Sequence, residues 1–286
     1  MGKMSAFTAA SALSVDDYFP VLQTSGSTTS NMKAKLSLMR DAMLANLGSD
    51  AGTHNSIYRG KNLGTSVTSA QWDAINAGTF TDMFIGDYWT INSKVYRIAA
   101  FDYWITKGDT ANSAHHVVLV PDANLASGGM NATATTEGGY VGSNMYTSDE
   151  SALATAKGII NTAFSGHLYK HREYLTNAVT NGYPSAGGWY DSTVDLMNEI
   201  MVYGCPIFTG IMNGTNIPAL YTVDNSQLPL FTLRPDKICN RYYYWLRDVV
   251  SASYFAFVDY YGLCAYDDAS YALGVRPAFG ICKTGV

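Results

Sequence analysis

The sequence predicts an α+β fold in which short strands outnumber helices. Runs of β-branched and aromatic residues alternate with Gly, Asn and Pro turns over most of the 286 residues. Beyond about residue 50, only the segments 148–164 and 192–204 combine a polar start with the apolar spacing of a helix. Two helices among many short strands are typical of the α+β class.

Composition narrows the class of protein. Charged residues make up only 14% of the chain, and the net charge is -5, which argues against binding to nucleic acid or to an anionic membrane surface. The high content of Gly, Ser, Thr, Asn and Tyr is typical of extracellular and virion proteins. No apolar run approaches the roughly 20 residues that span a bilayer. The N-terminus lacks the pattern of a signal peptide, so we expect synthesis in the cytoplasm and release inside a particle.

Residues 1–50 differ from the rest and form a predicted N-terminal segment. A strand is expected at 18–22 and a Ser/Thr/Gly loop at 24–30. A helix should follow, because its apolar positions recur every three or four residues; they are Met32, Leu36, Met39, Met43 and Leu47, with Gly48 as the C-cap. Since this stripe covers little more than two heptads, it predicts either a helix packed on its own domain or a docking and self-associating helix. The sequence GSDAG then reads as a linker to a second domain, 51–286.

Patterns along the second domain predict its elements in order. Strands are expected at 88–91, 95–101, 115–121, 242–250, 254–258 and 273–281. The helix at 148–164 should be capped by Ser148 or Asp149, and the helix at 192–204 should be capped by Ser192 and ended by Gly204. In the strand at 242–250, Arg247 and Asp248 form a candidate ion pair.

Histidine and cysteine spacings match no metal motif. His115 and His116 are adjacent and point to opposite faces of a strand, whereas His167 and His171 can share a helix face but lack the glutamate of a zinc protease motif. The four cysteines form no CxxC pair, and we expect them to be free and mostly buried; they are Cys205, Cys239, Cys264 and Cys282. We therefore expect neither a metal site nor a cofactor.

No catalytic constellation stands out either. The chain lacks a GxSxG turn, a glycine-rich phosphate loop and an SxxK motif. Asp191, Asp195 and Glu199 are spaced by four, so they can line one face of the second helix. A solvated helix face explains this pattern more simply than the carboxylate pair of a glycosidase, and the chain is predicted not to be an enzyme.

Tyrosines gather near the end of the chain. Of the 21 tyrosines, eight lie between residues 242 and 271, although a core has little use for hydroxyls that must each find a partner. Residues 259–271 mix Tyr, Asp, Ser, Gly and Ala, as antibody loops do, and predict an irregular binding segment between two strands. The alternative is a hydrophobic hairpin in a β core, in which Asp259, Asp267 and Asp268 would be costly to bury.

Several sequence motifs before and around this segment carry a resemblance to known proteins. The quoted stretches are YRGKNLGTSVTSAQWDAINAGTFTDMFIGDYWTINSKVYRIAAFDYW, GGYVGSNMY, AFSGHLYKHREYL, WYDSTVDLMNE and WLRDVVSASYF with ALGVRPAF. Through them, residues 55–282 resemble a family of phage and bacterial proteins of the C-type lectin-like superfold, whose members often serve as variable proteins of diversity-generating retroelements. The resemblance implies a lectin-like display domain with two helices and short twisted antiparallel strands.

The resemblance also implies which residues vary and what they bind. Between the constant WLR and GVRP halves, the positions most like diversified sites are Asp259, Tyr260, Tyr261, Leu263, Cys264, Tyr266, Asp267, Asp268 and Tyr271. They would bind a host cell-surface receptor, protein or glycan, from the surface of a phage particle. The N-terminal segment resembles those of fibres and adhesins, which implies docking on other virion proteins and a homotrimer.

Two rival functions remain. A structural or decoration protein of the capsid or tail would carry the same fold without binding a receptor. The chain also resembles, more distantly, the formylglycine-generating enzymes of this superfold, but Cys264 and Cys282 do not reproduce their cysteine pattern. The calcium-binding triplets EPN and QPD and the WND motif of sugar-binding lectins are absent, so calcium-dependent sugar binding is not implied.

Overall fold

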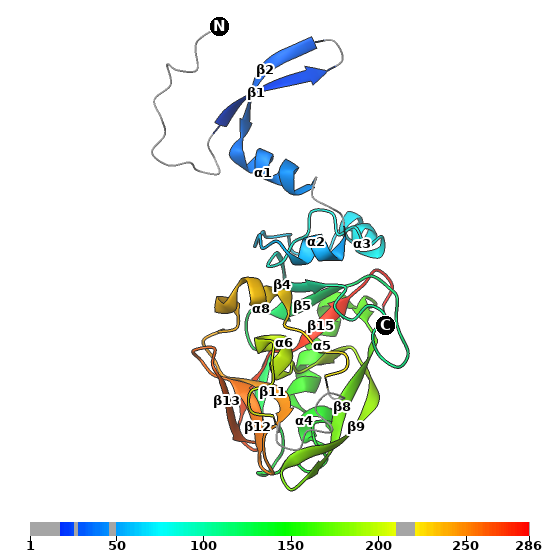
Figure 1. The fold of residues 1–286 in the computed structure, drawn as a ribbon, viewed down its shortest axis with the longest axis vertical. Helices are drawn as coiled ribbons and strands as arrows, with labels where there is room; N and C mark the ends of the chain where they lie inside the picture. Colours follow the sequence, from blue (N-terminus) through cyan, green and yellow to red (C-terminus); the bar gives the residue numbers. More distant parts are fainter. Residues whose placement is uncertain (1–17, 26–27, 46–49, 210–220, 286) are drawn as a thin grey trace. The chain divides into compact units, whose positions relative to one another are not determined.

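The computed structural model describes residues 18–25, 28–45, 50–209 and 221–285 (Figure 1). Contacts divide the chain into two compact units, 1–48 and 49–286, two residues before the predicted division. The larger unit mixes helices with a majority of strands, so the predicted α+β class is confirmed.

The smaller unit contains an antiparallel strand pair followed by a helix. Its elements are β1 (Tyr18–Ser25), β2 (Thr28–Lys35) and α1 (Leu36–Ala45). The predicted loop at 24–30 was wrong, because pairing continues from Tyr18 with Lys35 up to Ser25 with Thr28. The same pairing holds Met32 in a strand, so the helix begins at Leu36 rather than at residue 32. The predicted cap Gly48 lies outside the described residues.

The first sheet of the larger unit has the strand order β10-β15-β5-β4-β3, and β7 also pairs with β15. The strands are β3 (Tyr88–Ile91), β4 (Lys94–Phe101), β5 (Val117–Pro121), β7 (Leu168–Tyr169), β10 (Val194–Asp195) and β15 (Ala278–Ile281). All of these pairs are antiparallel. The predicted strands at 88–91 and 95–101 are confirmed, and the strand predicted at 115–121 begins two residues later, at Val117. The central β5 and β15 are buried along their whole length.

The second sheet has the order β13-β12-β11-β14-β6. Its strands are β6 (Ala126–Gly128), β11 (Tyr244–Val249), β12 (Tyr254–Val258), β13 (Cys264–Asp268) and β14 (Leu273–Val275). Only β11 and β14 run parallel. A separate hairpin is formed by β8 (His171–Thr180) and β9 (Tyr183–Ser192). In Figure 1 the orange strands β11 to β13 and the green hairpin β8–β9 lie at opposite sides of the larger unit.

The central strand β11 separates two cores. Tyr244 and Leu246 belong to the core that covers the first sheet, whereas Trp245 and Val249 belong to a second core, to which the helices α4 (Asn144–Thr147) and α5 (Ala152–Phe164) contribute. Because successive side chains point to opposite faces of a strand, a strand between two cores needs an unbroken apolar run. The neighbouring β12 follows the same rule, so both strands predicted in this region are confirmed.

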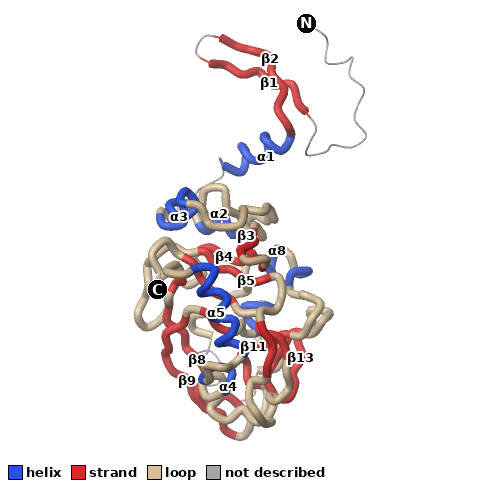
Figure 2. The backbone as a smooth tube through the Cα atoms, turned by 180° about the vertical axis from the view of Figure 1, so that it is seen from behind, coloured by secondary structure: helices blue, strands red, loops and turns tan. Residues whose placement is uncertain are grey.

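Helix α5 (Ala152–Phe164), labelled in Figure 2, is the longest described helix. It packs against β6 and β14. The buried residues Leu153, Ala156, Ile160 and Phe164 follow helical spacing. The predicted cap was wrong: Ser148 ends the short helix α4, so Ser151 caps α5 by accepting the N–H of Ala154. Several other described helices are short; they are α2 (Ala51–Asn55), α3 (Ser69–Asn76), α4 (Asn144–Thr147) and α8 (Pro229–Leu233), with a 3₁₀ turn at Pro235–Lys237.

The expected linker at 48–52 is partly helical, since Asp50 caps α2 by accepting the N–H of Thr53. The second predicted helix is much shorter than expected, because residues up to Asp195 are extended in β9 and β10. Helix α6 (Glu199–Tyr203) begins only after Asn198, whose side chain accepts the N–H of Met201. Gly204 ends it with a φ of 82°, as predicted.

Asp191, Asp195 and Glu199 therefore do not share a helix face. Asp195 and Glu199 are also buried rather than solvated. Asp195 accepts hydrogen bonds from the hydroxyls of Ser192 and of Tyr140, the latter at 2.9 Å.

The predicted strand at 273–281 is two strands in different sheets. The chain leaves β14 at Val275 and enters β15 at Ala278, with Arg276 and Pro277 between them. Arg276 is buried, and its guanidinium donates to the carbonyl oxygens of Pro121 at 2.8 Å, Ile238 at 2.9 Å and Lys237 at 3.0 Å. This one side chain joins its own segment to two others, at Pro121 and at residues 237–238.

Among the described residues, no helix combines the length and the hydropathy needed to cross a bilayer.

The buried His116 should make the folded chain less stable in acid. Its Nε2 accepts the N–H of Trp104 at 3.1 Å, so its proton lies on Nδ1, 3.2 Å from the Ala114 carbonyl. Burial lowers the pKa of His116 to about 3. Because the unfolded chain binds this proton more readily, the stabilisation is complete above the unfolded pKa of about 6.5 and is lost as the pH falls toward 3.

When the pH falls from 7.5 to 5, the free energy of unfolding of the parent should fall because of His116. In His116→Gln this loss should be smaller by about 2 kcal/mol. Urea unfolding at the two pH values measures this difference. His115→Gln, which changes a more exposed neighbour, is the control. An unchanged pH dependence in His116→Gln would contradict the argument.

Candidate binding surface

The nine predicted variable positions all lie on β13 and the loops that flank it. Five are exposed: Tyr260, Tyr261, Leu263, Tyr266 and Tyr271. The other four are half-buried: Asp259, Cys264, Asp267 and Asp268. The predicted irregular segment is in part a strand, because residues 264–268 pair antiparallel with β12. Its loop-like composition hid this pairing, although tyrosine itself favours strands. We call this region the tyrosine surface. It consists of β13, the flanking loops 259–263 and 269–272, and the neighbouring exposed rings of Phe208, Tyr243 and Tyr254.

Asp259 organises the first loop of this surface. Its Oδ1 accepts the N–H of Tyr261 and that of Leu263, each at 2.8 Å, and its carbonyl accepts the N–H of Gly262 at 3.0 Å. Gly262 has a φ of 91°, a conformation that other residues rarely adopt. The carboxylate of Asp259 therefore fixes the tight turn that displays Tyr261 and Leu263.

Asp268 does the same for the second loop. Its Oδ1 accepts the N–H of Ser270 at 2.9 Å and the hydroxyl of Ser270 at 2.7 Å. The Asp268 carbonyl accepts the N–H of Tyr271 at 3.0 Å, and Asp267 accepts the N–H of Asp268 at 2.8 Å. Each of these carboxylates stays at the surface and holds its own loop, so none carries the cost of a carboxylate buried in a core.

Two groups of aromatic rings cover the surface. In the first group, the ring of Tyr243 lies 5.5 Å from the buried ring of Phe257 and 5.5 Å from the exposed ring of Tyr260, measured between centroids. The rings of Tyr260 and Tyr261 are 4.0 Å apart. Hydrogen bonding with Tyr261 also raises the pKa of Tyr260. This group stands on the second core through Phe257.

The second aromatic group is centred on Tyr266. Its ring lies 5.5 Å from that of Tyr254 and 5.0 Å from that of Phe208. Phe208 comes from the loop after α6 and was missed by sequence reasoning. Nothing in the short apolar stretch around it distinguishes a surface position from a core position, since its place depends on a contact between distant segments.

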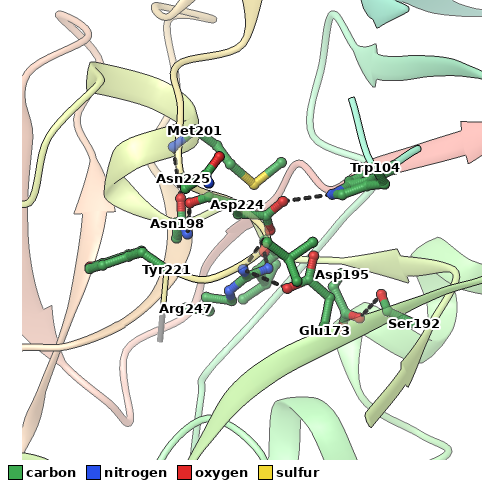
Figure 3. Close-up of polar contacts among 12 residues, drawn as sticks. Trp104, Glu173, Ser192, Asp195, Asn198, Met201, Tyr221, Asp224, Asn225 and Arg247 are labelled. Carbon is green, nitrogen blue, oxygen red and sulfur yellow. Dashed lines mark hydrogen bonds and ion pairs between the residues drawn. The ribbon is translucent and has the colours of Figure 1, made fainter. Parts of the chain in front are cut away.

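A separate polar cluster lies inside the larger unit (Figure 3). Arg247 donates to Asp224 at 2.5 Å and to Glu173 at 3.4 Å, and the indole of Trp104 donates to Asp224 at 2.6 Å. The expected Arg247–Asp248 pair was wrong, because adjacent side chains on β11 point to opposite faces. Asp248 instead accepts the Tyr221 hydroxyl at 2.7 Å.

The pKa values of the two carboxyl groups of this cluster, Glu173 and Asp224, are shifted in opposite directions. Burial, followed by the neighbouring Asp224 charge, raises the pKa of Glu173 well above its ordinary value. Burial opposes ionisation of Asp224 as well, yet the charge of Arg247 holds the pKa of Asp224 below its ordinary value. The charge of Arg247 therefore favours the ionised form of Asp224, whereas burial beside Asp224 disfavours ionisation of Glu173. All three side chains are buried, so we interpret the cluster as a structural centre.

An open cavity of about 410 Å³ lies elsewhere on the larger unit, beside the start of β8. It is lined in part by Lys170, Arg172 and Asp191. Asp191 accepts from Lys170 at 3.1 Å and from Arg172 at 2.8 Å, and Arg172 also pairs with Asp109. Because these charges already neutralise one another, the cavity offers little to select a charged ligand.

Histidines and cysteines do not converge. His167 precedes β7 and His171 begins β8, so the predicted helix face was wrong. The four cysteines are free, as predicted, but only Cys282 is buried; Cys205 is exposed, and Cys239 and Cys264 are half-buried. Within the described ranges, no group of three His, Cys, Asp or Glu side chains has the geometry of a metal site.

The tyrosine surface thus joins exposed rings from β12, β13 and four loops above a packed core, and it is the strongest candidate site in the described part of the chain. Comparison with protein-family models, with curated proteins and with solved structures finds no match for this chain.

Proposed function

We propose that this chain is a phage virion adhesin that binds a host cell-surface receptor through the tyrosine surface. The observation that carries the proposal is the exposure of four tyrosines on and beside β13; Tyr260, Tyr261, Tyr266 and Tyr271 are 39%, 62%, 47% and 56% exposed. Rigid amphipathic rings give contact area at low entropic cost, and aromatic residues dominate the energetics of binding interfaces. The rings stand on paired strands and on loops held by Asp259 and Asp268.

We propose further that the larger unit is a C-type lectin-like display domain without enzymatic activity. The WLR and GVRP motifs support this, because Arg247 and Arg276 are buried hubs, while five of the nine predicted variable positions between them are exposed. The nine predicted variable positions are then exchangeable within a constant frame, as the resemblance implies.

The smaller unit would dock on other virion proteins and join copies of the chain, as a homotrimer. Support comes from α1, where Leu38, Met39 and Met43 are all exposed. Exposed apolar residues clustered on one short helix favour association with another chain. The location of the protein on a virion follows from this docking role.

Charged residues on α1 should then weaken self-association. We expect Leu38→Asp combined with Met43→Asp to convert an oligomer into a monomer, because each carboxylate would have to be buried at the helix contact. Light scattering during size-exclusion chromatography measures the mass. Asn161→Asp, on the exposed side of α5, is the control, and an unchanged mass in the double variant would argue against association through α1.

The proposal is tested by competition. Purified chain added to host cells before the phage should block adsorption in proportion to the sites occupied. Particles that lack the chain should assemble but fail to adsorb. Particles that lack it and adsorb normally would favour the decoration protein instead.

A further inference from the structure

The loop after α6 carries two apolar side chains to the protein surface. Ile207 is 39% exposed and Phe208 is 37% exposed. The ring of Phe208 meets that of Tyr266 edge to face, in the arrangement that aromatic pairs prefer. The loop therefore extends the tyrosine surface with residues far from it in sequence.

A buried carboxylate holds this loop in place. Glu199 is fully buried, and its side-chain oxygens accept the N–H groups of Ile207 at 2.6 Å, Phe208 at 3.0 Å and Thr209 at 3.3 Å. Three successive backbone donors on one carboxylate offset the cost of burying it. Thr209 is fixed in addition, because its hydroxyl donates to the Val249 carbonyl at 3.1 Å.

The same carboxylate also reaches β13. The thiol of Cys264 donates to Oε1 of Glu199 at 3.6 Å, and burial followed by the Glu199 charge raises the pKa of this thiol. The backbone of Glu199 is anchored in turn, since its N–H donates to Asp248 on β11 at 2.7 Å. Glu199 thus connects the loop to two strands of the sheet that bears the tyrosine surface.

We propose that Ile207 and Phe208 form a fixed part of the receptor-binding surface and that Glu199 is the positioning residue for it. This inference rests on the proposed function and adds a contact from outside the variable segment. Ile207, Phe208 and Leu263 carry no polar group for a sugar hydroxyl, whereas apolar side chains among tyrosines are typical of the core of a protein interface. The occupant is therefore an apolar patch on a host surface protein.

Binding of the purified chain to host cells tests the contact directly. We expect Phe208→Ala to weaken binding at least tenfold, because it removes a ring at an aromatic cluster. Trp72→Ala is the matched control: Trp72 lies on α3, away from the tyrosine surface, and its half-buried ring stacks on His167. This variant should leave binding unchanged. Tyr261→Ala reports on the proposed function itself.

The outcomes separate the two proposals. If Tyr261→Ala weakens binding and Phe208→Ala does not, the further inference fails and the adhesin stands. If neither variant weakens binding, the adhesin fails too. If Trp72→Ala weakens binding as much as Phe208→Ala, the effect is a general loss of structure and the inference is overturned.

Glu199 is tested through its coupling to Phe208. Glu199→Gln replaces one acceptor oxygen by a donor, so it should release the loop and weaken binding by about the same factor as Phe208→Ala. Combining the two changes should then cause little additional loss, and Glu199→Asp should restore part of the binding. Independent, multiplying losses would show that Glu199 does not act through Phe208.

The class of receptor is tested on the cells. Protease treatment of the host surface should abolish binding of the parent chain, and periodate oxidation of glycans should leave it intact. Binding that survives protease and is lost after periodate would overturn the assignment to a protein.

Discussion

Replacing Tyr260, Tyr261, Tyr266 and Tyr271 together by alanine is expected to abolish adsorption to host cells while the chain stays folded. Interface tyrosines at hot spots contribute about 2 kcal/mol or more each, so the combined loss should exceed the range of an adsorption assay. Stability should change little, because all four side chains are exposed and none belongs to either core. Adsorption and thermal unfolding of the same preparation measure the two effects.

The control keeps the rings. Replacing the same four tyrosines by phenylalanine removes only the hydroxyls, so it should retain a substantial part of the binding if ring area dominates. An alanine variant that adsorbs like the parent would remove the basis of the proposed function. A variant that loses adsorption and its thermal transition together would show that these residues serve the fold.

The largest loss of stability is expected from Arg247→Met. The change leaves the buried carboxylate of Asp224 without its cation at 2.5 Å, and breaking one side of a buried ion pair costs about 3–5 kcal/mol. The effect should spread through the larger unit, because the contacts of Arg247 join β11 to Glu173 on β8 and to Asp224. Urea unfolding of parent and variant measures the difference in stability.

The matched control is Arg172→Met, which removes an exposed guanidinium that also pairs with two carboxylates, Asp109 and Asp191. Its loss should be much smaller, because solvent screens exposed pairs. Adding Asp224→Asn to Arg247→Met should recover part of the stability, since it removes the uncompensated charge. Equal losses in Arg247→Met and Arg172→Met would contradict a buried ion pair.

Together, the two predictions separate binding from folding. The side chains proposed to bind lie on an exposed strand and its loops, whereas the ion pair and the cores that stabilise the sheet lie beneath them. Substitutions at the exposed Tyr260, Tyr261, Tyr266 and Tyr271 should therefore be tolerated more readily than substitutions in β11.

Some elements could be predicted because their signals are local. Strands β3, β4 and β5 have β-branched and aromatic runs bounded by turns, and Gly204 supplies the backbone conformation that ends α6. Strand β13 could not be predicted, because its Tyr and Asp content matches that of a loop and its pairing is set by β12. Helix α6 was expected to be long, yet pairing of Val194 and Asp195 with β15 overrides the helical spacing.

The sequence by itself determined the α+β class, five strands of the larger unit (β3, β4, β5, β11 and β12), and a tyrosine-rich segment too polar for a core. These features depend on side-chain chemistry and on short periodicities within a few residues. Only the tertiary structure decided that Arg247 pairs with Asp224 rather than with its neighbour Asp248, and that Glu199 brings Phe208 to Tyr266. Such contacts join residues that are far apart in the chain, and they form because buried charges and N–H groups must find partners wherever the packed sheets place them.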